Sequence, residues 1–178
     1  MSARKTICDA VAIDKMISRL AYQIMEKRRK VDDLALIGIH TRGVYLARRI
    51  RERIYQIEAV QVLSGDMDIN LYRDDWTRIS HHPEVRSTRI NFDVDNREII
   101  LADDVLYTGR TIRAAMDALI DFGRPRRIEL AVLIERGHRE LPIQADYVGR
   151  HIRTDKTDVV NVLLTEQDGV DRVDLLSV

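Results

Sequence analysis

Hydrophobic residues follow two different patterns along this chain. In residues 10–29 the apolar side chains return every three or four positions, as on one face of an amphipathic helix. In residues 34–39 they are continuous, as in a strand that is buried on both faces. The two patterns predict helices over residues 10–29, 44–55 and 111–122, and strands over residues 34–39, 59–63, 98–102, 128–134, 147–149, 159–164 and 172–176. Strands that alternate with helices predict an α/β fold, with a mostly parallel central sheet flanked by helices.

One segment interrupts this pattern. Roughly residues 64–97 are polar, charged and weakly periodic, and we expect them to form a hairpin or a flexible arm. No repeat, low-complexity tract or linker rich in Gly, Ser or Pro divides the rest of the chain. With 178 residues the chain is long enough for a substantial core, and we expect a single domain over residues 1–178.

The charge balance excludes a strong overall field. The 29 Lys and Arg residues match 29 Asp and Glu residues, so no net charge draws the chain to nucleic acid or to a membrane, although local basic patches are still open. The single cysteine, Cys8, cannot form an intrachain disulfide, which fits a reducing compartment. No apolar run resembles a signal peptide or a membrane span. We therefore expect a cytoplasmic protein with no membrane partner.

The most informative stretch runs from Ile99 to Thr111. An apolar strand ends in two adjacent carboxylates, Asp103 and Asp104, and a short loop with Thr108 and Gly109 then opens a helix. The N-terminus of a helix can hold a phosphate on its backbone N–H groups. The carboxylates add acceptors for sugar hydroxyls, so this stretch predicts a grip on a ribose phosphate. An Asp-Asp pair that only caps a helix in a solvated turn is the plainer alternative.

Two further polar loops follow predicted strands, at residues 40–43 and 135–138. Ligands of parallel α/β sheets lie beyond the carboxyl ends of the strands, so all three loops are expected at one site. A ligand with a ribose, a monophosphate and a second anionic group matches them. Mg²⁺ could bridge the carboxylates and a pyrophosphate, because that cation prefers oxygen ligands. Arg42 could instead pair with a nearby acid, and the arginines of residues 48–53 are most simply solvated.

The stretch that ends at Thr111 resembles the phosphoribosyl pyrophosphate signature of type I phosphoribosyltransferases. Nearly the whole chain is similar to the PyrR type of that family, a bifunctional pyrimidine operon attenuation protein and uracil phosphoribosyltransferase. The segments that carry the resemblance are GIHTRG (38–43), DINLYRDD (68–75), LADDVLYTGRT (101–111) and RGHRELPI (136–143). The resemblance implies the type I phosphoribosyltransferase fold, a parallel sheet flanked by helices with a flexible arm or hood.

The resemblance also implies roles for particular residues. Asp103 and Asp104 would hold the ribose hydroxyls, Thr41 and Arg42 the diphosphate leaving group, and Arg73 would close over the site with the arm. The substrate-binding residues implied around the donor are Thr41, Arg42, Arg86, Asp103, Asp104, Val105, Leu106, Tyr107, Thr108, Gly109, Arg110 and Thr111, of which the last five surround the 5′-phosphate. The residues implied in catalysis are Asp103, Asp104, Arg42 and Arg73.

For the acceptor base, the resemblance implies uracil flanked by Arg136 and Val160. The reaction is uracil plus phosphoribosyl pyrophosphate giving UMP plus diphosphate. Its cofactor is Mg²⁺, bound through the substrate and waters, with Asp103 and Asp104 as further ligand candidates. Purine members of the wider family carry an acidic residue where this chain has Tyr107, so Tyr107 fits a pyrimidine.

A second function is implied by the same resemblance. PyrR-type proteins bind the leader of pyr mRNA in response to UMP and so favour transcription attenuation. Basic residues suited to RNA phosphates are Lys27, Arg28, His138, Arg139 and Arg150. The chain departs from the expected pattern at Gln144, where a basic residue is expected, and at Tyr22, where a small or imidazole side chain is expected. The resemblance further implies a homo-oligomer.

Two other readings are open from the sequence. One is an RNA-binding nucleotide sensor with little or no catalytic activity. The other is a ligand-responsive protein with neither activity, in which the pocket controls assembly. The presence of Thr41, Arg42, Arg73 and the complete 101–111 stretch favours catalysis over both.

Overall fold

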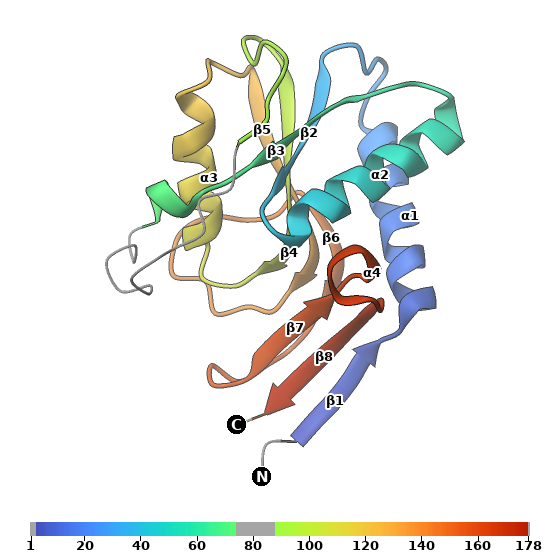
Figure 1. Ribbon diagram of the computed structural model, residues 1–178, viewed down its shortest axis with the longest axis vertical. Helices are drawn as coiled ribbons and strands as arrows, with labels where there is room; N and C mark the ends of the chain where they lie inside the picture. The colour runs from blue at the N-terminus through green and yellow to red at the C-terminus, as the bar shows by residue number, and fades with distance from the viewer. Residues whose placement is uncertain (1–2, 74–87, 178) are drawn as a thin grey trace.

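A computed structural model describes residues 3–73 and 88–177 of the chain (Figure 1). In chain order its elements are β1 (Ala3–Cys8), α1 (Ala10–Glu26), β2 (Leu34–Ile39), α2 (Arg42–Glu58), β3 (Leu63–Met67), the 3-10 helix η1 (Asn70–Tyr72), β4 (Glu98–Leu106), α3 (Arg110–Ile120), β5 (Arg127–Glu135), β6 (Tyr147–His151), β7 (Val159–Leu163), α4 (Thr165–Asp168) and β8 (Arg172–Ser177).

The centre of the molecule is a five-stranded sheet in the order β3-β2-β4-β5-β6, and every neighbouring pair is parallel. Helices α1 and α2 cover one face and α3 covers the other (Figure 1). In β2, Leu34 and Leu36 pack with α1 and α2, whereas Ala35, Ile37 and Ile39 pack on the side of α3. The side chains of β2 are apolar at every position because both faces of this strand are buried.

A three-stranded antiparallel sheet, β1-β8-β7, joins the two ends of the chain. It lies beside the central sheet, and in it Ala3 of β1 is paired with Ser177 of β8 (Figure 1). Its buried carboxylate, Asp174, is held by Arg4, Thr6 and Arg172. No apolar pattern in the sequence marks β1, because the middle of this edge strand, Arg4 to Thr6, is polar and charged.

The segment after α2 differs from the sequence prediction. The predicted strand over residues 59–63 is wrong, because α2 continues to Glu58 and Ala59 ends it in the left-handed conformation. Strand β3 begins at Leu63, so the first residues of the expected arm belong to the central sheet. The apolar residues Val60 and Val62 gave the misleading signal. Residues 74–87 of the expected arm lie outside the described residues.

The start of α2 is pressed against the sheet at a glycine. A Cβ atom at Gly43 would lie 2.3 Å from the carbonyl oxygen of Ala102 and 3.1 Å from the Cα of Asp103. The first turn of α2 therefore rests directly on the backbone of β4, where a larger residue has no room. Within the described ranges, no helix is both long and apolar enough to span a membrane.

Candidate functional site

Strand β4 carries the two adjacent carboxylates of the site. Its pairing with β2 ends at Ala102, but its pairing with β5 continues to Leu106. The predicted strand end at residue 102 is therefore too early, because β5 supplies hydrogen-bond partners further along. Asp103 and Asp104 consequently lie on the strand itself, just past the end of β2, and Asp103 is only 7% exposed.

The surroundings of the two carboxylates favour their protonated forms. Burial raises the pKa of Asp103 well above its ordinary value, and the neighbouring charge of Asp104 adds to this rise. Burial also raises the pKa of Asp104, which a hydrogen bond with Asp103 and the charge of Arg42 partly offset. Two backbone amides hold the pair: the Asp104 N–H donates to Asp103 Oδ1 at 2.9 Å, and the Val105 N–H to Asp104 Oδ1 at 2.8 Å. The site thus fits a ligand that brings hydroxyl donors or positive charge.

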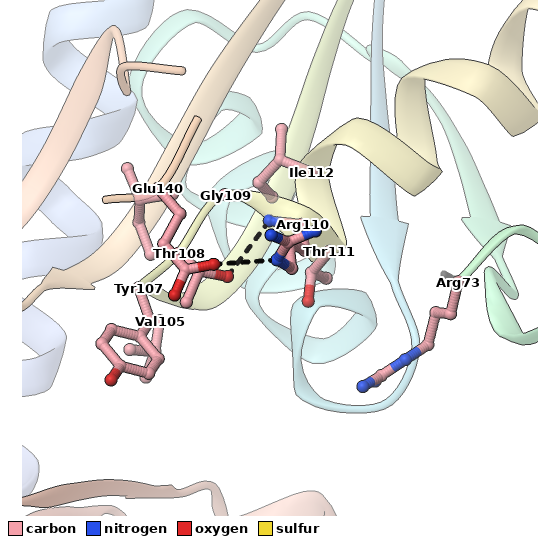
Figure 2. Close-up of a pocket in the computed structure, with 10 residues that line it drawn as sticks. Arg73, Val105, Tyr107, Thr108, Gly109, Arg110, Thr111, Ile112 and Glu140 are labelled. Carbon is pink, nitrogen blue, oxygen red and sulfur yellow. Dashed lines mark hydrogen bonds and ion pairs between the residues drawn. The ribbon is translucent and has the colours of Figure 1, made fainter. Parts of the chain in front are cut away.

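A cavity of about 390 Å³ opens beside the loop that joins β4 to α3 (Figure 2). Its lining consists of Arg73, Val105, Leu106, Tyr107, Thr108, Gly109, Arg110, Thr111, Ile112 and Glu140. Gly109 precedes α3 with φ at +91°, and the Thr108 hydroxyl accepts the Arg110 N–H at 3.3 Å. Because the first N–H groups of a helix have no acceptor within the helix itself, a helix N-terminus at a cavity suits an anion. The predicted phosphate-binding residues 107–111 all line this cavity, as do Val105 and Leu106 of the wider predicted substrate-binding set.

A second loop closes one side of the same cavity. The Glu140 N–H donates to the Thr108 carbonyl at 3.0 Å, and the Arg110 Nε–H donates to Glu140 Oε2 at 2.9 Å (Figure 2). Glu140 was not among the residues predicted for the site, although it lies within the RGHRELPI segment. Its position in that segment was the available signal for its place at the site.

On the other side of the carboxylates lies the start of α2. The His40–Thr41 peptide bond is cis. The Arg42 guanidinium forms a two-pronged ion pair with Asp168 of α4, at 2.9 Å from Nε and 2.7 Å from Nη2. Hydrogen bonding to Asp168 raises the pKa of Arg42, and the charge of Asp104 adds to the rise. Arg42 is therefore brought to the carboxylates as expected, and it also has the acidic neighbour that the sequence left open.

Arg136 and Tyr107 form a stacked pair beside the cavity. The guanidinium carbon of Arg136 lies 4.1 Å from the centre of the Tyr107 ring, and Arg136 Nη2–H donates to the Asp155 carbonyl at 2.9 Å. The Nε of Arg136 is buried and has no hydrogen-bond partner in the part of the chain that the structure describes. An orphaned buried donor is costly, so it suits a ligand acceptor. Val160 lies in β7, partly buried against the core.

The predicted arm residues are only partly placed. Arg73 follows η1, and its side chain reaches toward the cavity from the side opposite Tyr107 (Figure 2). Arg86 lies outside the described residues.

The basic residues expected to meet RNA fall into two groups. Arg28 is a buried side chain, 5% exposed, and its guanidinium bonds Glu98 and Glu129 together with the Tyr147 hydroxyl. Lys27, Arg139 and Arg150 are exposed, and Lys27 Nζ lies 4.4 Å above the Tyr147 ring. His138 Nε2 lies 2.6 Å from the Thr154 carbonyl oxygen. The structure thus places the Arg28 guanidinium in the interior, away from any polyanion.

The protein oxygens available to a cation are few. Within residues 3–73 and 88–177, no group of three or more His, Cys, Asp or Glu side chains could hold a metal. Asp103 and Asp104 are two adjacent hard oxygen donors on β4, directly before the residues that line the cavity. This donor set fits Mg²⁺, which commonly binds through one or two carboxylates while substrate phosphates and waters complete its shell.

The chain is similar over nearly its whole length to known sequences. Residues 4–167 match the family described as Phosphoribosyl transferase domain. The bifunctional protein PyrR of Desulfosudis oleivorans is 53% identical over 97% of this chain and 96% of its own length. The bifunctional protein PyrR of Thermus thermophilus is 53% identical over 98% of this chain and 97% of its own.

Solved structures share the architecture. A hypoxanthine-guanine phosphoribosyltransferase of Bacillus anthracis superposes with a TM-score of 0.70 at 14% identity, and covers 97% of both chains. The hypoxanthine phosphoribosyltransferase of Trypanosoma cruzi gives a TM-score of 0.64 at 18% identity, over 84% of this chain and 82% of that chain. At these identities the likeness confirms the expected type I phosphoribosyltransferase fold alone.

Proposed function

The chain belongs to the phosphoribosyl transferase family, among relatives that are bifunctional PyrR proteins, and we propose that it transfers a phosphoribosyl group to uracil. The reaction converts uracil and phosphoribosyl pyrophosphate into UMP and diphosphate. One observation carries this proposal: a single strand–loop–helix unit joins two adjacent carboxylates to a helix N-terminus that lies at a cavity. The hydroxyls and the phosphate of one sugar phosphate match these two features.

The residues divide the donor between them. The N-terminus of α3 and the hydroxyl of Thr111 bind the 5′-phosphate, and Asp103 and Asp104 accept hydrogen bonds from the ribose hydroxyls. Arg42 and Arg73 approach the diphosphate from two sides. As the bond from the anomeric carbon to diphosphate breaks, negative charge grows on the leaving group, and both cations stabilise it.

Asp103 and Asp104 would hold Mg²⁺ together with the substrate and waters, and the cation would neutralise part of the leaving-group charge. Carboxylates with raised pKa values support such a partner, because a nearby cation favours their charged form.

The base would lie against Arg136. Tyr107 stacks beneath this guanidinium and fixes its plane, and the unpaired Nε can donate to a carbonyl oxygen of a pyrimidine. Val160 at the start of β7 supports the other edge of the site. An acid in place of Tyr107 would form an ion pair with Arg136 and so draw its donors away from the base.

The test is UMP formation from uracil, with orotate, hypoxanthine and guanine as competing acceptors. Replacing both carboxylates, Asp103→Asn with Asp104→Asn, should lower kcat by about a hundredfold or more while the protein stays folded. Asp117→Asn is the matched control, because this carboxylate pairs with Arg113 on the exposed side of α3. Turnover of uracil by the double variant at the wild-type rate would remove the carboxylates from the mechanism.

A second function, regulation of pyrimidine genes by UMP-responsive binding to a pyr mRNA leader, is supported by exposed cations near strand β6. Lys27 lies over the Tyr147 ring at the start of β6, and Arg150 lies at its other end. Strand β6 is an edge strand of the central sheet, and both cations are exposed to solvent near its two ends. Arg139, on the loop after β5, is exposed and adds a further positive charge, and its Nε lies 3.8 Å from Glu135 Oε1.

RNA binding is tested by titrating a pyr leader RNA with and without UMP at several salt concentrations. The double variant Arg139→Gln, Arg150→Gln should bind more weakly and reduce the salt slope by about two, one for each lost phosphate contact. Arg51→Gln, at an exposed position of α2, is the control. Tight UMP-dependent RNA binding without any uracil turnover would instead favour a pure nucleotide sensor.

We also place the protein in the cytoplasm, since a lone buried cysteine suits a reducing compartment, and we expect a homo-oligomer. Exposed apolar side chains at Leu71, Ile120 and Phe122 support self-association. Light scattering measures the assembly directly.

A further inference from the structure

The Arg42 side chain is held along one edge and open along the other. Asp168 accepts hydrogen bonds from Nε and Nη2, which form one edge of the planar guanidinium. The Nη1 group has no hydrogen-bond partner within residues 3–73 and 88–177. Because a guanidinium carries five donors in a fixed plane, the Nη1–Nη2 edge remains available for a second oxyanion.

Asp168 is itself fixed by its surroundings. Its Oδ2 also accepts the Leu164 N–H at 2.8 Å, and its side chain is only 15% exposed. The short helix α4 that carries it is tied to α2 by a second arginine, since Arg49 bonds both Glu166 and Asp171 at 2.6–2.8 Å. Asp168 therefore has little freedom to follow Arg42, and the geometry of the pair is set by the fold.

From this geometry we propose that Asp168 is a positioning residue, which aims the free edge of Arg42 at the diphosphate of the donor. The proposal rests on the diphosphate role of Arg42 in the proposed function. A long arginine side chain loses rotamer freedom when it binds an anion. The pair with Asp168 fixes the side chain beforehand, so that this loss does not weaken binding of the substrate.

The charges around Arg42 indicate that Asp168 positions its guanidinium and does not merely neutralise it. Arg42 lies between two carboxylates, because Asp104 acts on it from β4 and Asp168 holds it from α4. Without Asp168, the charge of Asp104 would remain as an attraction toward the ribose subsite. The guanidinium could then turn from the leaving group to the carboxylates that bind sugar hydroxyls.

The experiment compares wild type, Asp168→Asn and Asp171→Asn. An asparagine at 168 keeps an oxygen for the Leu164 N–H but loses the charge, and Asp171→Asn weakens the same turn without touching Arg42. We expect the Kd for magnesium diphosphate, by calorimetry, and the KM for phosphoribosyl pyrophosphate each to rise about tenfold in Asp168→Asn. The KM for uracil should stay within about twofold, as should every parameter of Asp171→Asn.

A double-mutant cycle separates positioning from general loosening. In an Arg42→Ala background, Asp168→Asn should weaken diphosphate binding by no more than about twofold, because no guanidinium remains to be aimed. Additive losses in the cycle would overturn the proposal. So would equal or tighter diphosphate binding by Asp168→Asn, since tighter binding means that Asp168 competes with the anion.

The outcome is distinct from that of the proposed function. A wild type that binds diphosphate but makes no UMP from uracil removes the proposed reaction, and the binding data alone then decide the role of Asp168. A wild type that binds no diphosphate overturns the positioning role as well.

Discussion

The contact between α2 and β4 should control activity more strongly than stability, and Gly43→Ala tests this. The added methyl group would lie 2.3 Å from the Ala102 carbonyl oxygen and 3.1 Å from the Asp103 Cα. Both are backbone atoms, which cannot turn aside as a flexible side chain can. Carbon and oxygen atoms in ordinary contact are roughly 1 Å further apart, so α2 must move back from the sheet by about that amount.

This shift acts on the residues that handle the leaving group. Thr41 and Arg42 begin α2, whereas Asp103 lies on the strand from which the helix moves. A misplacement of about 1 Å can lower a rate about a hundredfold, while overpacking of this kind costs about 1–3 kcal/mol of stability. We therefore expect kcat/KM for phosphoribosyl pyrophosphate to fall about a hundredfold in a protein that remains folded at 25 °C.

The assay pairs steady-state kinetics with urea unfolding, and Ile24→Val is the matched control. Ile24 is fully buried on α1, away from the site, and its truncation should cost about 0.5–1.5 kcal/mol with unchanged kinetics. A Gly43→Ala enzyme within a few-fold of wild-type kcat/KM would refute the reasoning, because the helix would then be free to shift without moving the site.

Three further predictions follow from the ion pairs and stacking contacts. Arg28→Met removes the guanidinium from the buried carboxylate of Glu129, which keeps only the Tyr147 hydroxyl within hydrogen-bond distance among the described residues, so urea unfolding should show a loss of about 3–5 kcal/mol; a loss below about 1 kcal/mol would contradict the buried network. The Arg49 guanidinium lowers the pKa of Asp171 to about 2, so the pair stabilises the fold above the ordinary carboxyl pKa and this stability is lost as pH falls toward 2. Asp171→Asn should flatten the decline of Tm between pH 4 and pH 2.5, and an unchanged decline would argue against this pair. Tyr107→Ala should raise the KM for uracil by up to about thirtyfold through loss of the stack under Arg136, whereas Tyr107→Phe keeps the ring and should leave KM unchanged.

The local parts of this structure could be predicted from the sequence. Continuous apolar runs predicted β2, β4 and β5, because strands buried on both faces have no polar side. The order of carboxylates, small loop residues and helix start likewise predicted the cavity residues at 105–111, since all of them are close in sequence. The predicted strand at 59–63 failed because a left-handed Ala59 separates the helix end from apolar residues that look like a strand.

Long-range partners could not be predicted in this way. Arg42 and Asp168 are 126 residues apart, and nothing near Asp168 except an Asp-Gly turn marks it. Arg28 belongs to a run of basic residues that looks solvated in the sequence. Its partners are nevertheless Glu98 of β4 and Glu129 of β5, which are far from it along the chain. Such pairs depend on the register of strands and the docking of helices, which no local pattern contains.

The net charge of zero does not by itself predict how well the protein binds RNA, because many of its arginines are paired with carboxylates. On α2, Arg48 pairs with Asp66, Arg49 with the α4 turn and Arg53 with Asp14, so the arginines that looked solvated dock the helix against its neighbours. A cation paired in this way offers little to a phosphate, because its partner must first be displaced. The cations that remain exposed without a carboxylate, such as Lys27 and Arg150, therefore matter more than the total count. Since each phosphate contact contributes about 0.7–0.9 to the salt slope, that slope would count the cations that RNA actually reaches.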